Sequence, residues 1–376
     1  MSRPPTRPLE GLRVLDFTRV YSGPYATLLL SDLGAEVIKV EHPEYGDDSR
    51  SFGPFINGTS GYFETLNRGK KSIAVDYRTI EGQRMLAQLA QSADVLIENF
   101  RPGKMRAYGL DEPALRPTCP RLIYVSISGF GQFGPYSHLG CYDVVAQAMS
   151  GLMSMTGLPE LPIKTGPAIA DAITGLTAAV GLLAALYQRE RTGQGTHIDI
   201  AMLDSVFATL ENSLAATSIT GESPARAANA DAVLAPFDSF PTHDGWVVIG
   251  VGNDRLWRRL AALIDPALVE DARFATNTGR VMHYAVLRPI VAGWCSAYTS
   301  DALLAHLHAA DIPAGAVRSM DELLHDPHLE ARDMLLKLSS GVLVPGSPIH
   351  IAGSVRPTPQ RAPLLGEHNA DILGSL

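Results

Sequence analysis

The fold is decided by residues 9–41, LEGLRVLDFTRVYSGPYATLLLSDLGAEVIKVE. Within this stretch, Leu12–Phe17 is an apolar run typical of a buried strand, and Glu36–Glu41 alternates like a second strand. Between them, Gly23-Pro24 opens a helix, because proline is already set for the first helical turn. A strand, a helix and a strand in this order predict one unit of a parallel sheet.

The same alternation continues along the chain. Further strands are expected at Ser72–Asp76, Asp94–Glu98, Leu122–Ile127 and His197–Ile200. The pattern predicts an α/β fold, with a doubly wound, Rossmann-like sheet in a large domain. A long apolar helix from Ala168 to about Arg189 is expected inside the core. Its uncharged part is 17 residues long, whereas a membrane span needs roughly 20 strongly apolar residues.

The pattern changes after the helix expected at Met202–Ala216. Residues 217–232 are small and polar and indicate a linker. Short strands and three helical stretches follow (254–264, 284–297 and 301–310), which predict a smaller α+β domain. We therefore expect a large domain from 1–216, a small domain from 217–325, and a proline-rich segment at 326–376 that returns to the large domain.

Composition excludes several classes of protein. A chain of 376 residues with 46% hydrophobic and 19% charged residues is ordinary globular material. The net charge of −8 gives no reason to expect nucleic acid or a membrane surface as a partner. Three scattered cysteines without a CxxC pair, and histidines without HExxH, support no disulfide framework and no metal site. No signal peptide is evident at the start, so we expect a cytoplasmic protein.

Charge is unevenly distributed, and two common site motifs are missing. Residues 1–121 carry 16 basic and 15 acidic side chains, a net of +1, and the remainder carries 15 and 24, a net of −9. A polyanionic ligand is therefore expected on the first third. The turn after the first strand lacks GxGxxG, which excludes a nicotinamide enzyme. No GxSxG is present for a serine hydrolase.

Asp171 lies at the start of the most apolar helix. A carboxylate in a first turn gains about 0.3–1 kcal/mol from the helix dipole, so Asp171 could be a purely structural acid. It could equally be a carboxylate nucleophile, because an ordinary aspartate, with a pKa of about 3.9, is ionised at neutral pH without a partner base. Spacing alone leaves both interpretations open.

A family resemblance runs through the whole chain. Its motifs include Asn67-Arg-Gly-Lys-Lys-Ser, Glu98-Asn-Phe-Arg-Pro-Gly, Asp171-Ala-Ile-Thr-Gly, Arg191-Thr-Gly-Gln-Gly and Pro363-Leu-Leu-Gly-Glu-His. Together with residues 9–41, they resemble the family III CoA-transferases (the CaiB/BaiF family), which include formyl-CoA and carnitine CoA-transferases. The resemblance implies that Asp171 is the nucleophile and forms an anhydride and then an aspartyl-CoA thioester. It also implies CoA and acyl-CoA as substrates, with no permanently bound cofactor and no ATP.

Site residues follow from the same resemblance. Those that match CoA contacts in relatives are Val20, Tyr21, Ser22, His42, Val75, Asp76, Tyr77, Arg78, Asn99, Phe100, Arg101 and Arg106. Those that match a substrate pocket are Tyr21, Tyr142 and Asp143. Two positions depart from the family, because Ala107 and Gly140 stand where relatives often carry a basic residue.

The acceptor is expected to be a short dicarboxylate such as itaconate, mesaconate, malate or glutarate, with succinyl-CoA as donor. Candidates for binding the distal carboxylate are Arg50, Arg68 and Arg226. Oxalate is disfavoured, because the small domain reads Ile249-Gly-Val-Gly-Asn and lacks a glycine-dense loop.

Two alternative functions would use other residues of this chain. An α-methylacyl-CoA racemase of the same superfamily would need histidine directly before the aspartate of a Gly-His-Asp motif, where this chain has Tyr142; His138 lies nearby in sequence. A non-catalytic CoA-binding protein would not need Asp171. The resemblance further implies a homodimer of interlocked rings, with the active site near the boundary between subunits.

Overall fold

A computed structural model describes residues 7–356, 358 and 360–374. Two prolines of the proline-rich tail, Pro357 and Pro359, therefore lie outside the described residues, as do both ends of the chain. The chain forms two compact units that alternate along the sequence. The first unit uses residues up to 152, 165–211 and residues from 327 onward, and the second uses 153–164 and 212–326.

A six-stranded sheet forms the centre of the first unit. Its strands are β1 (Arg13–Asp16), β2 (Glu36–Glu41), β5 (Lys71–Ala74), β6 (Val95–Glu98), β7 (Ile123–Ser128) and β10 (His197–Ala201). All neighbours pair in parallel, in the order β10-β7-β6-β1-β2-β5, which confirms the predicted central parallel sheet. The order reverses between β1 and β6. Open α/β sheets bind ligands beyond the carboxyl ends of the strands at such a reversal.

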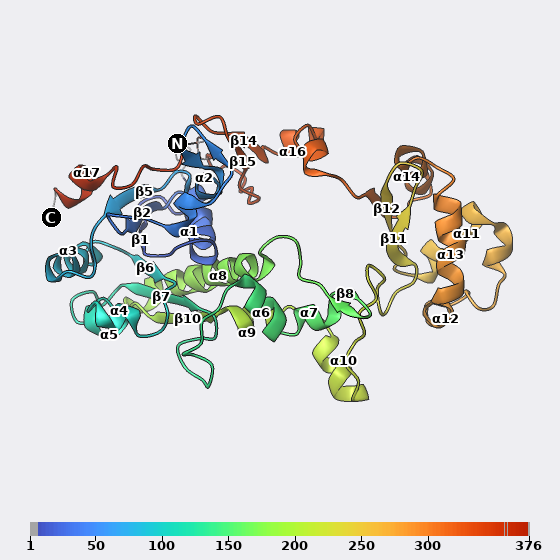
Figure 1. The fold of residues 1–376 in the computed structure, drawn as a ribbon, viewed down its shortest axis with the longest axis horizontal. Helices are drawn as coiled ribbons and strands as arrows, with labels where there is room; N and C mark the ends of the chain where they lie inside the picture. Colours follow the sequence, from blue (N-terminus) through green and yellow to red (C-terminus); the bar gives the residue numbers. More distant parts are fainter. Residues whose placement is uncertain (1–6, 357, 359, 375–376) are drawn as a thin grey trace. The chain divides into compact units, whose positions relative to one another are not determined.

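Helices cover both faces of this sheet (Figure 1). On one face, α1 (Ser22–Asp32) and α8 (Ile169–Thr192) pack against each other and bury an apolar layer with the strands. On the other face, α3 (Ile80–Ala90) buries Leu86 and Leu89.

The C-terminal helix α17 (Asn369–Leu373) lies beside the edge strand β5. The backbone N–H of His368 donates to Ser72 O at 2.9 Å, and Asn369 Oδ1 accepts the N–H of Ala74 at 2.8 Å. Residues 368–373 thus cover the edge of the sheet at β5.

The expectation that the long helix is wholly buried is wrong. One face of α8 is buried through small residues such as Ala170, Ala178 and Ala185. Larger apolar residues line the opposite face, where Val180 is 68% and Tyr187 is 70% exposed. With a mean hydropathy of 1.9, α8 is long and apolar enough to cross a membrane, but this is weak evidence, since the core helix of a soluble protein passes the same test. The helix is apolar on two sides, and a single chain covers only one of them.

The second unit contains an antiparallel sheet of β11 (Phe237–Pro241), β12 (Trp246–Gly250) and β13 (Ala314–Ala316). Its core is filled from α11 (Asp254–Ile264), α13 (Tyr284–Cys295) and α14 (Ser300–Ala309).

The single helix predicted at Met202–Ala216 is wrong. The chain forms α9 (Met202–Phe207) and α10 (Ser213–Thr220) instead, and Glu211 between them has a left-handed backbone with φ of 48° that interrupts the helix. The remaining elements are η1 (Asp48–Ser51), β3 (Phe55–Ile56), β4 (Thr59–Ser60), α2 (Gly61–Asn67), α4 (Lys104–Ala107), α5 (Glu112–Leu115), α6 (Asp143–Met149), α7 (Leu152–Met155), β8 (Gly157–Leu158), β9 (Leu161–Pro162), η2 (Pro266–Val269), α12 (Asn277–Met282), α15 (Met320–Leu323), α16 (Pro327–Ala331), β14 (Leu335–Lys337) and β15 (Leu343–Pro345).

Candidate active site

Asp171 is held at the junction of two helix N-termini. It is the third residue of α8, and the helix brings it to the first residue of α1, Ser22. The hydroxyl and the backbone N–H of Ser22 lie near the Asp171 carboxylate and lower its pKa. Gly175, one turn further along α8, makes this approach possible, because a Cβ there would stand 2.6 Å from Ser22 O. The glycine of the Asp171-Ala-Ile-Thr-Gly motif thus sets how closely the two helices pack.

A second carboxylate shares the N-terminus of α8. Asp143, the first residue of α6, accepts the backbone N–H of Ala170 at 2.8 Å and of Asp171 at 3.3 Å through Oδ1. Gln147 Nε2 donates to its other oxygen at 2.7 Å. Burial and the negative charge of Asp143 raise the pKa of Asp171 to about 6, against the lowering effect of Ser22. Asp171 therefore remains ionised at neutral pH but is more basic than an ordinary aspartate.

Tyrosine rings lie beside these carboxylates. Burial is the main cause that raises the pKa of Tyr21 and of Tyr62, and the charge of Asp171 adds to it, so both hydroxyls stay protonated. The two rings are 6.3 Å apart between centroids, and Phe52 packs on Tyr62 at 5.5 Å. Sequence reasoning missed Tyr62, because only the fold brings α2 near α8. Tyr142 precedes Asp143, but its side chain is 76% exposed in the single chain.

The turn after β1 leads into α1 and is fixed by side chains from other loops. Asn99, just beyond β6, accepts the N–H of Arg19 and donates to Arg19 O, both at 2.8 Å. Val20 has a left-handed backbone with φ of 68°, and its N–H lies 3.2 Å and 3.3 Å from the two carboxylate oxygens of Asp47. Gly23 is required, because a Cβ at this position would lie 2.2 Å from Thr18 Cγ2. The loops after β1 and β6 are thereby joined at the reversal point of the sheet.

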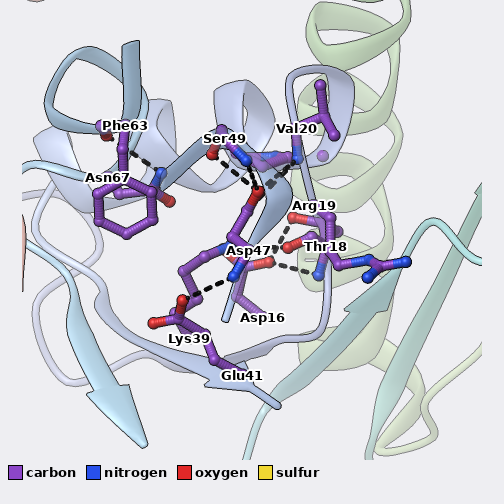
Figure 2. A network of polar contacts seen from close by, with 12 residues as sticks. Asp16, Thr18, Arg19, Val20, Lys39, Glu41, Asp47, Ser49, Phe63 and Asn67 are labelled. Atoms are coloured by element: carbon purple, nitrogen blue, oxygen red, sulfur yellow. Dashed lines mark hydrogen bonds and ion pairs between the residues drawn. The ribbon is translucent and has the colours of Figure 1, made fainter. Parts of the chain in front are cut away.

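Buried charged side chains contact the turn after β1 (Figure 2). Lys39 and Asp47 have fully buried side chains, with Nζ and Oδ2 2.8 Å apart, and Lys39 also donates to Thr18 O at 2.7 Å. Although burial opposes it, Lys39 lowers the pKa of Asp47 to about 2. A second buried pair joins Lys70 to Asp16 at 3.1 Å. Burial lowers the pKa of Lys70 to about 8, although Asp16 opposes the shift.

Three predicted CoA-binding residues, His42, Tyr77 and Phe100, line one small hollow. Arg19, which was not predicted, also contributes to its wall. His42 follows β2 and stacks on Tyr45 with ring centroids 4.0 Å apart. Its buried Nε2 makes no hydrogen bond within the described residues and lies 3.6 Å from Asp76 Oδ1.

Other predicted contacts are placed differently. Val75 is buried in the apolar core under the hollow. Arg78 donates to both oxygens of Asp76 and lowers the pKa of that carboxyl to about 2. Arg106 is exposed and pairs with Asp111 at 3.2 Å.

Arg101 lies against one of the two positions that depart from the family. A Cβ at Gly140 would stand 2.7 Å from Arg101 Nη2, so the glycine makes room for this guanidinium.

The three arginines suggested for a distal carboxylate are already engaged. Arg50 donates to both oxygens of Glu41 at 2.7 Å, and Arg68 pairs with the buried Asp32. Arg226 donates to three backbone carbonyls, those of Ser154, Leu158 and Pro159. Arg68 is buried, and leaving its charge unpaired there would be costly. A distal carboxylate would have to displace one of these partners or use another group.

Comparisons with known proteins show the family of the chain. The model of CoA-transferase family III matches residues 9–369. The succinate–glutarate CoA-transferase of Agrobacterium fabrum is 41% identical over 382 residues, covering 98% of this chain and 96% of that protein. The acetyl-CoA:oxalate CoA-transferase of Acetobacter aceti is 41% identical over 372 residues, covering 98% and 95%.

A crystal structure of a CAIB/BAIF family protein from Brucella suis superposes with a TM-score of 0.89 at 40% identity, covering 99% of both chains. A match of this extent includes both units and every residue of the site described above. The chain therefore belongs to CoA-transferase family III and is an enzyme of that class.

Proposed function

We propose that this enzyme transfers CoA from succinyl-CoA to a short dicarboxylate, with glutarate the first acceptor to test, and that Asp171 is its nucleophile. The observation that carries the proposal is the position of Asp171 between Ser22 and Asp143, with a raised pKa of about 6. Succinyl-CoA is the donor in the names of relatives that act on glutarate, D-citramalate and mesaconate. These acceptors are all dicarboxylates, which is the acceptor class that the sequence predicts.

The first half of the reaction builds the enzyme thioester. The Asp171 carboxylate attacks the thioester carbon of succinyl-CoA, the C–S bond breaks, and an aspartyl–succinyl anhydride and CoA thiolate result. The thiolate then attacks the aspartyl carbonyl, which releases succinate and leaves an aspartyl-CoA thioester. With a pKa of about 6, about nine in ten Asp171 carboxylates are ionised at pH 7.

The second half repeats these steps with the acceptor. A carboxylate of glutarate attacks the aspartyl-CoA thioester, giving a second anhydride and CoA thiolate. The thiolate attacks the glutaryl carbon, so glutaryl-CoA leaves and the Asp171 carboxylate is restored. Ser22 N–H, at the N-terminus of α1, is placed to stabilise the negative charge that develops on the aspartyl oxygen. One thioester replaces another, so no energy input is needed.

The CoA moiety is proposed to bind at the loops after β1, β2 and β6. Arg19, His42 and Phe100 line the hollow there, and Asn99 holds the first of these loops in place. The net positive charge of the first 121 residues favours the phosphates of CoA in this region.

Two other activities are less well supported. A racemase would need a proton acceptor directly before Asp143, where this chain places the exposed Tyr142. The oxalate enzyme of Acetobacter aceti is as similar in identity as the glutarate enzyme, so oxalate with acetyl-CoA belongs in the acceptor panel.

The enzyme is proposed to act as an interlocked homodimer in the cytoplasm, where acyl-CoA substrates occur. The support for a dimer is the α8 stripe, formed by Leu176, Val180, Leu183 and Tyr187. These residues recur every three or four positions, lie on one helix face, and are all exposed in the single chain. A second copy that covers this face would remove them from water.

Mass spectrometry of acyl-CoA products tests the activity. Purified enzyme is mixed with succinyl-CoA or acetyl-CoA and a panel of glutarate, mesaconate, citramalate, itaconate, malate and oxalate. Glutaryl-CoA or another dicarboxylyl-CoA should form from succinyl-CoA, and D171A should form none while still binding CoA. Borohydride should reduce the trapped thioester and convert Asp171 to homoserine in the corresponding peptide. Turnover by D171A, or no new thioester with any acceptor, would refute the proposal.

A further inference from the structure

We propose that Asp47 is a positioning residue for the transfer reaction, because it holds Val20 in its left-handed conformation and thereby places Ser22 against Asp171. This inference rests on the proposed function of Asp171. It gives a role in positioning to the buried Lys39–Asp47 ion pair, which takes no part in the reaction steps themselves.

Val20 has a left-handed backbone although its side chain is β-branched. A left-handed backbone is rare for any residue other than glycine and is a true outlier for a β-branched one. Val20 adopts φ of 68° in the turn that precedes α1. Strained residues of this kind persist only where their surroundings hold them, and they cluster at functional sites.

The Asp47 carboxylate fixes the backbone of Val20 by accepting a hydrogen bond from its N–H (Figure 2). Asp47 Oδ1 also accepts the N–H of Ser49 at 2.9 Å and the hydroxyl of Ser49 at 2.7 Å. Lys39 fixes the other oxygen, Oδ2, at 2.8 Å. The carboxylate thus cannot rotate without breaking bonds to three residues.

The effect of Val20 on the site follows from its position in the chain. Asn99 holds Arg19 on one side, and α1 begins at Ser22 on the other. The backbone between these fixed points contains only Val20 and Tyr21. If Val20 relaxed to a negative φ, the path into α1 would change, and Ser22 N–H would turn away from Asp171.

Stability alone does not account for such a pair. Burying two charges costs desolvation energy, and apolar replacement of a buried ion pair is often neutral or stabilising. Lys39 and Asp47 are both fully buried, and their contacts to Thr18 O and Val20 N–H converge on one turn. What the pair provides is the geometry of that turn.

Two double variants separate the hydrogen bond from the ion pair. K39M/D47N and K39M/D47L both lose the pair without leaving a lone buried charge, and the two replacements of Asp47 are similar in size. Asparagine can still accept from Val20 and Ser49 through Oδ1, whereas leucine cannot. With succinyl-CoA and glutarate, or the best acceptor found, kcat should stay within about threefold of wild type for K39M/D47N and fall at least tenfold for K39M/D47L. The KM for succinyl-CoA should change less than kcat.

R189M is the matched control. Arg189 is a buried cation on the same helix as Asp171 but 18 residues further along, or about 27 Å away. R189M should lower the melting temperature without lowering the kcat of the folded enzyme. Equal kcat for the two double variants, at comparable melting temperatures, would overturn the inference.

Failure of the proposed function is distinguishable from failure of this inference. If the wild-type enzyme transfers no CoA, the proposed function is wrong; the variants test the inference only in an enzyme that does transfer it. If K39M/D47L does not fold, K39M/D47A replaces it, because alanine also lacks an acceptor and leaves no lone buried charge. A tenfold lower kcat for K39M/D47A than for K39M/D47N would support the inference there, and equal values would overturn it.

Discussion

At the scale of single residues, two carboxylates compete for one helix N-terminus. Asp143 already accepts the N–H groups of Ala170 and Asp171, so the Asp171 side chain receives little help from the α8 dipole and faces a like charge instead. Its compensation comes from α1, through Ser22. The arrangement gives a carboxylate that is ionised at neutral pH and more nucleophilic than a solvated one.

The pH dependence of turnover should report this environment. Because the pKa of Asp171 in the free enzyme is about 6 and only its ionised form attacks, kcat/KM should rise with pH and reach half its plateau near pH 6. In D143N the like charge is removed while an acceptor for Ala170 N–H is kept, so the midpoint should move to lower pH. A pH–rate profile from 5 to 8.5 measures both. An unchanged midpoint in D143N would show that Asp143 does not act through charge.

The raised pKa of Asp171 also predicts how the free energy of unfolding depends on pH. Most carboxyl groups in folded proteins have a lowered pKa and stabilise the fold when ionised, whereas Asp171 should destabilise it. The folded-state pKa of Asp171 lies above the ordinary value of 3.8, so ionisation favours the unfolded chain. This destabilisation is absent below about pH 4, grows through pH 6 and is complete above it. D171N should therefore melt higher than wild type at pH 7.5, with a difference that disappears toward pH 4. Thermal melts at several pH values test this, and a difference independent of pH would contradict it.

Sequence reasoning reached some of these residues and not others. A lone aspartate at a helix start has two interpretations, and only the motifs around it favoured the nucleophile. The partners of Arg50 and Arg68 could not be predicted, because Glu41 and Asp32 lie 9 and 36 positions away and meet them only in the folded chain. Tyr62 could not be predicted either, because it comes near Asp171 only in the folded chain.

At the scale of elements, the contact between α1 and α8 decides the position of the nucleophile. The two helices lie close together at Gly175, where a Cβ would stand 2.6 Å from Ser22 O and 3.1 Å from Tyr25 Cδ1. Ser22 O is a backbone atom, so it cannot move aside for a side chain at Gly175 as the end of a flexible side chain would. The helix pair therefore tolerates no side chain at this position.

G175A should displace α8 from α1. We expect a loss of about 1–3 kcal/mol in the free energy of unfolding from overpacking, and a fall in kcat of at least tenfold as Asp171 moves from Ser22. The matched control is G181A on the same helix, where the nearest atom to a Cβ is 3.5 Å away. G181A should gain about 0.5–1 kcal/mol from helix propensity with unchanged kcat. Urea unfolding and steady-state kinetics measure both, and equal behaviour of the two variants would contradict the argument.

Element patterns in the sequence predicted the central sheet well. Each expected strand of the sheet appears within two residues of its predicted ends, because buried strands bounded by turns leave a clear pattern. The break between α9 and α10 was missed, since nothing in the local pattern marks the left-handed backbone at Glu211. The apolar face of α8 was misassigned because periodicity shows that a face is apolar but not what covers it.

At the scale of the whole molecule, the α8 stripe predicts the assembly. Light scattering should show a mass of two chains for the wild-type protein. V180D places a charge in the stripe, where Val180 is 68% exposed in the single chain, and should shift the mass toward one chain or cause aggregation. I80D is the control, because Ile80 is more exposed and begins the separate helix α3. An unaltered two-chain mass in V180D would place the interface elsewhere.

The return of the C-terminus to β5 has a consequence for how the protein is made. The ribosome must release residues 364–374 before His368 and Asn369 can pair with Ser72 and Ala74. By then the entire intervening chain, including residues 212–326, has been synthesised. The edge of the sheet thus stays open until residues 368 and 369 have emerged, and a chain that stops before them leaves β5 without this last neighbour.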